Sequence, residues 1–260
     1  MTSLPDRTIT AIGDHHDALA DVIPNLSDDE LTAPSGASEW TVAQVFSHLG
    51  SGAELGLATF QALVTGDALP DDEANRAVWD RWNAMSPREQ ADGFLEHNER
   101  LLDAYEELTP DQRENLEVKL PYLPEPIRIA TYLGMRLNEL ALHSWDARVA
   151  LDNTATLDEE AAAVLAEHHA GEMSFLLAFT AKPAALGEQA VLTLDSYGLV
   201  LADRAALTTS VEAATATFDG PLEAFIRLIS GRLKPEHTPS GVAVTGNVSL
   251  DDLRKVFPGY

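Results

Sequence analysis

Apolar stretches separated by polar capping sequences run through the first 180 residues. In four places a Ser or Thr is followed three positions later by Glu or Gln, the capping box that opens helices, and these boxes begin at Ser27, Thr41, Ser86 and Thr109. Two of the boxes place proline at the first helical position, where its missing N–H costs nothing. The pattern predicts long helices over about residues 5–22, 41–65, 86–107, 126–151 and 158–179, with a short helix and a proline-rich connection between 107 and 126.

The pattern changes after residue 187. Short runs rich in β-branched residues occupy residues 189–194, 213–218 and 242–245, and each is bounded by Gly or Asp, as strands are. Helical segments lie between and after these runs, over residues 221–230 and 249–257. We therefore expect an α+β chain of two domains: a four-helix bundle over residues 1–182 and a small α/β domain over residues 183–260.

The charge distribution supports two units with different surfaces. The chain of 260 residues has 42 acidic and 17 basic side chains, a net charge of −25. Residues 1–180 carry 33 acidic and 10 basic side chains, whereas residues 181–260 carry 9 and 7. The change falls at the Lys182-Pro183 turn, where we place the boundary. So strong a negative charge argues against binding to nucleic acid or to an anionic membrane.

Composition restricts the chemistry and the location further. The chain has no cysteine, which excludes disulfides and cysteine-built metal sites and leaves any metal to His, Asp and Glu. Apolar runs stay far shorter than the roughly 20 residues that span a bilayer. The first residues lack the basic and apolar regions of a signal peptide. We expect a cytoplasmic protein, monomeric or homodimeric.

Polar residues share one face of the predicted helix 126–151. Ile129, Tyr132, Arg136, Glu139 and His143 follow at steps of three and four residues, which keeps them on one stripe. Glu139 and His143 are one turn apart, so both can reach the same ion. The simpler interpretation is a solvated surface pair, of the kind that acidic helices often contain.

A second candidate ligand, His48, lies in the predicted helix 41–65, which carries no charged residue except Glu54 and should be mostly buried. A single histidine in such a helix is often a hydrogen-bonded core residue. The small residues Gly50, Ser51 and Gly52 would instead leave space beside it. If the two helices face each other, His48, Glu139 and His143 form a set of two histidines and one carboxylate suited to Zn²⁺ or a similar divalent ion.

These two helices also carry a family resemblance. Residues 40–49, WTVAQVFSHL, resemble the opening WTV-x-x-V-x-x-HL of the mycothiol-dependent maleylpyruvate isomerase family, and residues 139–146, ELALHSWD, resemble its E-x-x-x-H-x-W-D helix. Three C-terminal segments resemble the smaller domain of that family: Gly220-Pro221-Leu222, Ser230-Gly231-Arg232 and Val256-Phe257-Pro258. The similarity therefore runs through most of the chain, in order.

The resemblance implies a DinB-like four-helix bundle that holds a divalent metal, usually zinc, followed by a small domain similar to sterol carrier proteins. It places the metal ligands at His48, Glu139 and His143 and associates Arg232 with catalysis. It also implies mycothiol as the thiol cosubstrate or cofactor. Because a metal-bound thiol is deprotonated, it can attack a small electrophile, and a chain without cysteine must take that thiol from outside.

Within this family we expect thiol transfer to a small electrophilic substrate. The alternatives are cis–trans isomerisation of the maleylpyruvate type, and a non-catalytic module in which the metal is structural and the small domain binds an apolar ligand.

We expect Tyr132 and Arg136 to bind the cofactor, although Arg136 could instead form a buried structural pair with a glutamate. Asp146 either orients His143 or forms a surface salt bridge with a neighbour such as Arg148.

Two further expectations concern residues outside the ligand set. We assign Trp40 and Trp145 to packing near the site. The adjacent pairs His15-His16 and His168-His169 are expected at the surface, since neighbouring residues of a helix point apart.

Overall fold

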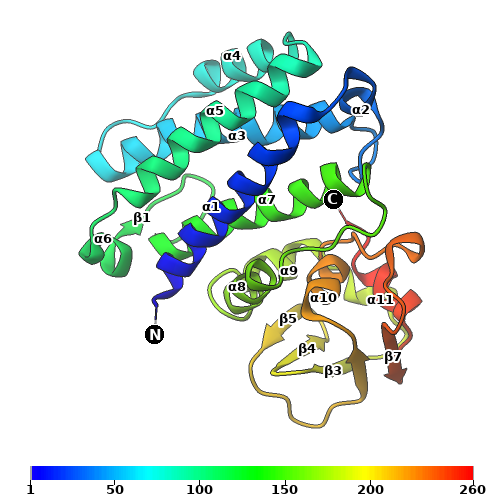
Figure 1. The fold of residues 1–260 in the computed structure, drawn as a ribbon. Helices are drawn as coiled ribbons and strands as arrows, with labels where there is room; N and C mark the ends of the chain where they lie inside the picture. Colours follow the sequence, from blue (N-terminus) through cyan, green and yellow to red (C-terminus); the bar gives the residue numbers. More distant parts are fainter. Residues whose placement is uncertain (1, 260) are drawn as a thin grey trace. The chain divides into compact units, whose positions relative to one another are not determined.

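The computed structural model describes residues 2–259 and divides the chain into two compact units, Met1–Ala155 and Thr156–Tyr260. Four long helices make up most of the first unit (Figure 1): α1 (Leu4–Val22), α3 (Val42–Thr65), α5 (Pro87–Glu106) and α7 (Ile129–Val149). Each of these helices packs against two of the others, in the cyclic order α1, α5, α3, α7. The first unit is therefore the four-helix bundle that the sequence predicts.

Capping explains where most of these helices begin. All four predicted capping boxes are present, with reciprocal bonds between side chains and backbone at Ser27, Thr41, Ser86 and Thr109. They open α2 (Asp28–Thr32), α3, α5 and α6 (Pro110–Asn115). A two-stranded ribbon, β1 (Glu117–Val118) with β2 (Ile127–Arg128), then leads into α7.

The sequence pattern does not reveal one helix of the first unit, α4 (Asp72–Asn83). It is polar on nearly all sides and buries a single side chain, Trp82, so it lacks the apolar stripe by which helices are recognised. Its start is nevertheless encoded locally, because the Asp71 carboxylate accepts a hydrogen bond from the Ala74 amide at 2.8 Å.

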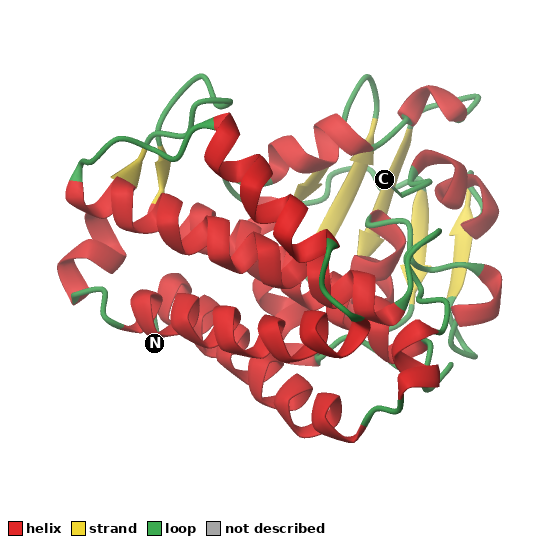
Figure 2. Cartoon of the chain, turned by 90° about the horizontal axis from the view of Figure 1, so that it is seen from above, coloured by secondary structure: helices red, strands yellow, loops and turns green. Residues whose placement is uncertain are grey.

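The second unit contains the sheet drawn in yellow in Figure 2. It has five strands in the order β5-β4-β3-β6-β7. Its strands are β3 (Ala190–Leu194), β4 (Tyr197–Leu201), β5 (Ala205–Thr208), β6 (Ala216–Asp219) and β7 (Ala243–Gly246). Only the β3–β6 pair is parallel. The helices of this unit are α8 (Glu159–Ala170), α9 (Ser174–Thr180), α10 (Leu222–Ile229) and α11 (Leu250–Val256). This confirms the α+β fold class, while β4 and β5 were not predicted.

The observed division after Ala155 differs from the predicted boundary between residues 182 and 183. Helices α8 and α9 pack against β5, and α8 also packs against α10, so both belong to the second unit. The predicted helix 158–179 is thus two helices, and neither is part of the bundle. The charge pattern placed these residues with the bundle because charge reflects only the exposed side of a helix. The exposed side of α8 is acidic, whereas its apolar side packs on the small domain.

The two histidine pairs are buried, so the expectation that they lie at the surface is wrong. Helix α1 packs against both α5 and α7, so two of its faces are covered and both His15 and His16 are enclosed. The same holds for His168 and His169 in α8, between α10 and β5. Within residues 2–259, none of the helices is long and apolar enough to cross a membrane.

Candidate metal centre

His48 in α3 and the Glu139–His143 pair in α7 come together inside the bundle. The His48 Nε2 lies 3.0 Å from Glu139 Oε2, and the His143 Nε2 lies 3.7 Å from the same oxygen. Each of the three residues offers one ligand atom, and these atoms lie within 4.8 Å of one another. Among the described residues this is the one group of three or more acidic or histidine side chains that converges in this way. The structure thus brings together the three predicted ligands.

The burial of the trio is graded. The His48 and Glu139 side chains are each 39% exposed, whereas the His143 side chain is 9% exposed. One side of the group is therefore fixed in the bundle and the other is open. Such a partly open set is what a catalytic site needs, because a fully enclosed one leaves no position for a substrate.

The Glu139 carboxylate is held in its charged form. Burial acts to raise its pKa, but the hydrogen bond with His48 and the positive potential of His143, His48 and Arg136 outweigh burial, and the pKa is lowered. The carboxylate is therefore ionised at neutral pH. An ionised oxygen between two imidazole nitrogens is a suitable donor set for a borderline divalent ion.

Asp146 supports His143 from the opposite side of the ring. Its Oδ2 lies 2.9 Å from the His143 Nδ1, and the Asp146 side chain is buried. A carboxylate in this position favours a proton on Nδ1 and leaves the lone pair on Nε2, the nitrogen that faces Glu139. Of the two roles considered for Asp146, the structure has the one that orients His143.

Trp40 has a larger place in the site than packing alone suggests. Its ring centroid lies 5.0 Å from that of His48 and 5.8 Å from that of His143, and the second pair is stacked at 29°. The two imidazoles are themselves 4.7 Å apart, edge to face. Trp145, two residues after His143, is instead a buried core residue that donates from Nε1 to the Ala155 carbonyl at 2.8 Å.

Arg136 and Tyr132 lie on the same stripe of α7, next to α3. The Arg136 Nη2 donates to the Leu49 carbonyl at 3.1 Å and to Asn98 Oδ1 at 2.7 Å. Its Nη1 is 3.5 Å from the place where a side chain on Gly52 would begin. Arg136 therefore joins α7 to α3 and α5 through neutral acceptors, and the structural pair with a glutamate is not what the structure has.

A buried polar chain continues from Arg136. The Asn98 Nδ2 lies 3.1 Å from the His16 Nδ1, which links α5 to α1. Asn98 was not predicted, because one buried amide in an acidic helix has no distinguishing pattern. The Arg136 Nε is buried and has no hydrogen-bond partner within residues 2–259. Burial lowers the pKa of Arg136, against the opposing effect of Tyr105, Glu139 and Tyr132.

The Tyr132 hydroxyl is 3.4 Å from the Gly56 carbonyl of α3, and the side chain is half-buried. Burial together with the nearby phenol of Tyr122 raises the pKa of Tyr132 to about 12, although Arg136 acts in the opposite direction. Tyr132 is thus a neutral hydroxyl at any physiological pH. It can donate or accept a hydrogen bond but cannot serve as a base.

Arg232 belongs to the second unit, not to the bundle that holds the trio. It is buried and follows α10, and its Nη1 donates to the Ser230 carbonyl at 3.2 Å. The preceding Gly231 has φ +76°, and a side chain there would stand 2.3 Å from the backbone of Gly259. This contact requires glycine, so the chain on either side of Arg232 has a defined path.

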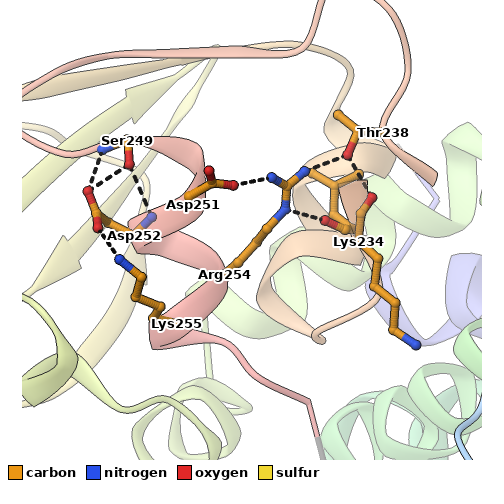
Figure 3. A network of polar contacts seen from close by, with 8 residues as sticks. Lys234, Thr238, Ser249, Asp251, Asp252, Arg254 and Lys255 are labelled. Carbon is orange, nitrogen blue, oxygen red and sulfur yellow. Dashed lines mark hydrogen bonds and ion pairs between the residues drawn. The ribbon is translucent and has the colours of Figure 1, made fainter. Parts of the chain in front are cut away.

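The segment after Arg232 is tied to α11 by Arg254 (Figure 3). The Arg254 guanidinium donates to the Leu233 carbonyl at 2.8 Å, to Thr238 Oγ1 at 2.6 Å and to Asp251 at 2.5 Å. A cavity of about 240 Å³ lies beside these residues. It is lined by Leu228, Gly231, Leu233, Lys234, Pro235, Arg254, Phe257 and Pro258. Arg232 itself does not line it.

A family model described as the mycothiol maleylpyruvate isomerase N-terminal domain matches residues 12–148, a span that contains His48, Glu139 and His143. Two uncharacterized proteins of Mycobacterium tuberculosis, from strains CDC 1551 / Oshkosh and ATCC 25618 / H37Rv, are each 26% identical over 149 residues. That alignment covers 56% of this chain and 68% of each relative.

Two solved structures share the fold over nearly the whole chain. One is the crystal structure of the mycothiol-dependent maleylpyruvate isomerase, with a TM-score of 0.64, and the other is a histidine-to-alanine mutant of that enzyme, with a TM-score of 0.65. Both are 19% identical to this chain, and each match covers 95% of this chain and 98% of the other. At this identity the similarity establishes the fold, including that of the second unit.

Proposed function

The chain belongs to the mycothiol maleylpyruvate isomerase family through its N-terminal domain, and from this premise we propose that it is a metal-assisted, mycothiol-dependent enzyme of the isomerase type. The observation that carries the proposal is the convergence of His48, Glu139 and His143 within 4.8 Å, inside the matched span. The family relation favours cis–trans isomerisation over the thiol transfer that we expected from the sequence.

The donor set fits a divalent ion, and zinc is our choice. His48 and His143 present Nε2 atoms, Glu139 presents an ionised oxygen, and Asp146 fixes the orientation of one imidazole. When bound, such an ion supplies the positive charge that lowers the pKa of a thiol from its usual value of about 8.5. The open side at His48 and Glu139 is where the thiol would approach.

Mycothiol supplies a sulfur that adds to an activated C=C bond and leaves again, so that the carbon–carbon bond is single in between, can rotate, and re-forms in the other geometry. The reaction needs no oxidant and has no net proton change. The bundle contributes a fixed cation nearby, since Arg136 lies one turn before Glu139 on α7. We propose that Arg136 and Tyr132 bind the polar part of the cosubstrate.

The proposal extends to the second unit through Arg232. An unsaturated acid of the maleylpyruvate type is an anion, and a guanidinium is the side chain that best pairs with a carboxylate. We assign Arg232 to catalysis, as the group that holds the substrate anion. In an Arg232→Lys variant the metal content should be unchanged. Turnover should fall, because an ammonium group cannot make the two parallel hydrogen bonds that a guanidinium makes with a carboxylate.

A matched pair of histidine variants tests the metal-dependent activity. His48→Ala should lose most of its bound metal and its mycothiol-dependent turnover of maleylpyruvate, followed by NMR of the product. His97→Ala is the control, since His97 lies 3.7 Å from Glu54 outside the trio. A His48→Ala protein that keeps full metal content and full activity would contradict the proposal.

The products distinguish the remaining alternatives. Accumulation of a stable mycothiol adduct instead of the trans isomer would assign thiol transfer. A protein whose melting temperature falls on chelation, but which turns over no substrate with any thiol, would be a metal-stabilised binding module. Mass spectrometry of the reaction mixture and a melt with and without chelator separate these outcomes.

A further inference from the structure

Trp40 lies beside the trio, directly before the N-cap residue of α3. Its indole touches both imidazoles, and the residue as a whole is 36% exposed. The ring therefore packs against both His48 and His143 while part of it reaches solvent. An aromatic face offers no ligand atom and no hydrogen-bond donor along the ring normal, so the indole does not compete with the imidazoles for an ion.

The loop that carries Trp40 is firmly positioned. The Ser35 amide donates to the Trp40 carbonyl at 2.9 Å, and the Gly36 amide donates to the Asp146 carbonyl at 2.8 Å. A side chain at Gly36 would stand 2.7 Å from Val149 and 3.1 Å from Asp146, so the loop lies directly on α7. Its backbone turns back at Glu39, which has a φ of +70°.

Asp146 connects this loop to the metal ligands. Its backbone carbonyl holds Gly36, and its carboxylate holds the His143 imidazole. Asp146 therefore positions both the loop that carries Trp40 and the His143 side chain. Trp40 stacks on His143 at 29° in this arrangement. A merely packing tryptophan would not need to contact both histidines of the trio.

We propose that Trp40 is a positioning residue of the metal centre: its indole fixes both imidazole rings and occupies the space from which additional water ligands would reach a bound ion. This proposal rests on the proposed metal site. With Trp40 in this place, an exogenous thiol would approach the ion from the other side of the trio. Its soft, polarisable sulfur can pack against an aromatic ring, which a water molecule does poorly.

Cobalt(II) replaces zinc as a spectroscopic probe in the test. Wild type, Trp40→Phe and Trp40→Ala are loaded with Co²⁺, and the visible absorption per bound ion and the affinity in chelator competition are measured. Trp79→Phe is the matched control, since Trp79 is an exposed residue of α4. Circular dichroism of each metal-free protein shows whether it is folded.

We expect wild type, Trp79→Phe and Trp40→Phe to share intense visible bands, which indicate a low coordination number. Trp40→Ala should lose band intensity several-fold as water enters, and its affinity should fall about tenfold, as when other groups that orient ligands are removed. Co²⁺ should also quench tryptophan emission less in Trp40→Phe than in wild type. This comparison does not depend on a substitution that destabilises the protein.

Equal spectra and affinities in wild type and Trp40→Ala would overturn the role of Trp40 and leave the metal site intact. Equal quenching in wild type and Trp40→Phe would also overturn it, because the indole would then lie away from the ion. Failure of wild type to bind Co²⁺ would reject the metal site and, with it, this inference.

Discussion

Asp146 shows how much of the site depends on a single buried side chain. It is enclosed, it pairs with His143 at 2.9 Å, and its own backbone anchors the 33–41 loop. The sequence places Asp146 one turn after His143, but it also left open a surface salt bridge with a neighbour such as Arg148. Only the packing of the loop on α7, which sequence periodicity does not contain, decides between these roles.

Replacing Asp146 by Asn should therefore weaken metal binding about tenfold. The amide keeps the shape but removes the negative charge that makes the His143 imidazole a better donor. Chelator competition measures the affinity. Asp152→Asn, an exposed change just after α7, should leave it unaltered, and an Asp146→Asn protein with wild-type affinity would show that the contact does not tune the site.

His169 gives the second unit a pH-dependent stability. Burial, and secondarily the charge of His168, lowers the pKa of His169 to about 4, and its Nδ1 has no hydrogen-bond partner within the described chain. Unfolded histidine titrates near 6.5, so between these pH values the unfolded state binds more protons. Stability should fall as the pH drops from about 6.5 to about 4, by roughly 3 kcal/mol at most.

Urea unfolding followed by circular dichroism at several pH values measures this dependence. His169→Gln should flatten the decline over that range, whereas the control His97→Gln should retain it. A decline of the same size in His169→Gln and wild type would mean that other groups cause it.

Among the secondary-structure elements, the four long helices of the bundle can be predicted from the sequence. Caps and apolar faces locate α1, α3, α5 and α7 to within a few residues. Elements without such signals were missed: α4 buries only Trp82, and β4 and β5 are short strands that follow β3 through tight turns. Their positions depend on contacts between elements, which local pattern does not encode.

The Trp82 side chain anchors α4 through two glycines. Its ring fills a notch at Gly50 of α3 and Gly93 of α5, and its Nε1 donates to Glu54 at 2.8 Å. Arg81 also pairs with Glu54, which explains the single charge in an otherwise uncharged helix. Glycine at position 50 is thus required by packing, not by backbone conformation.

Gly50→Ala should destabilise the bundle by about 2 kcal/mol, because the new methyl group would stand 2.2 Å from the Trp82 ring and force it out of the notch. Gly56→Ala in the same helix is the control. Its nearest neighbour is the flexible Leu101 side chain at 3.4 Å, so the better helix propensity of alanine should leave stability unchanged or raised by up to about 1 kcal/mol. Urea unfolding measures both, and equal losses would refute the notch.

For the whole molecule, the sequence indicated two units, one helical and one mixed, and the structure has both. The boundary moved from residues 182/183 to 155/156 because α8 and α9 pack on the small domain. The three proposed ligands were selected from residue type and helical spacing plus a family resemblance, and the structure brings them together. The contacts of Trp40 with both imidazoles and the hydrogen bonds of Asn98 were not predicted, since they depend on how separate helices and loops meet.

At the level of the whole molecule, we propose that His48, Glu139 and His143 hold an ion to which mycothiol binds through sulfur. The most direct measurement is a titration of the Co²⁺-loaded protein with mycothiol, followed by ultraviolet and visible absorption. We predict a sulfur-to-cobalt charge-transfer band that saturates at one thiol per ion in wild type and is absent in His48→Ala. The absence of this band in wild type, or an equal band in His48→Ala, would overturn thiol binding at an ion held by these three residues.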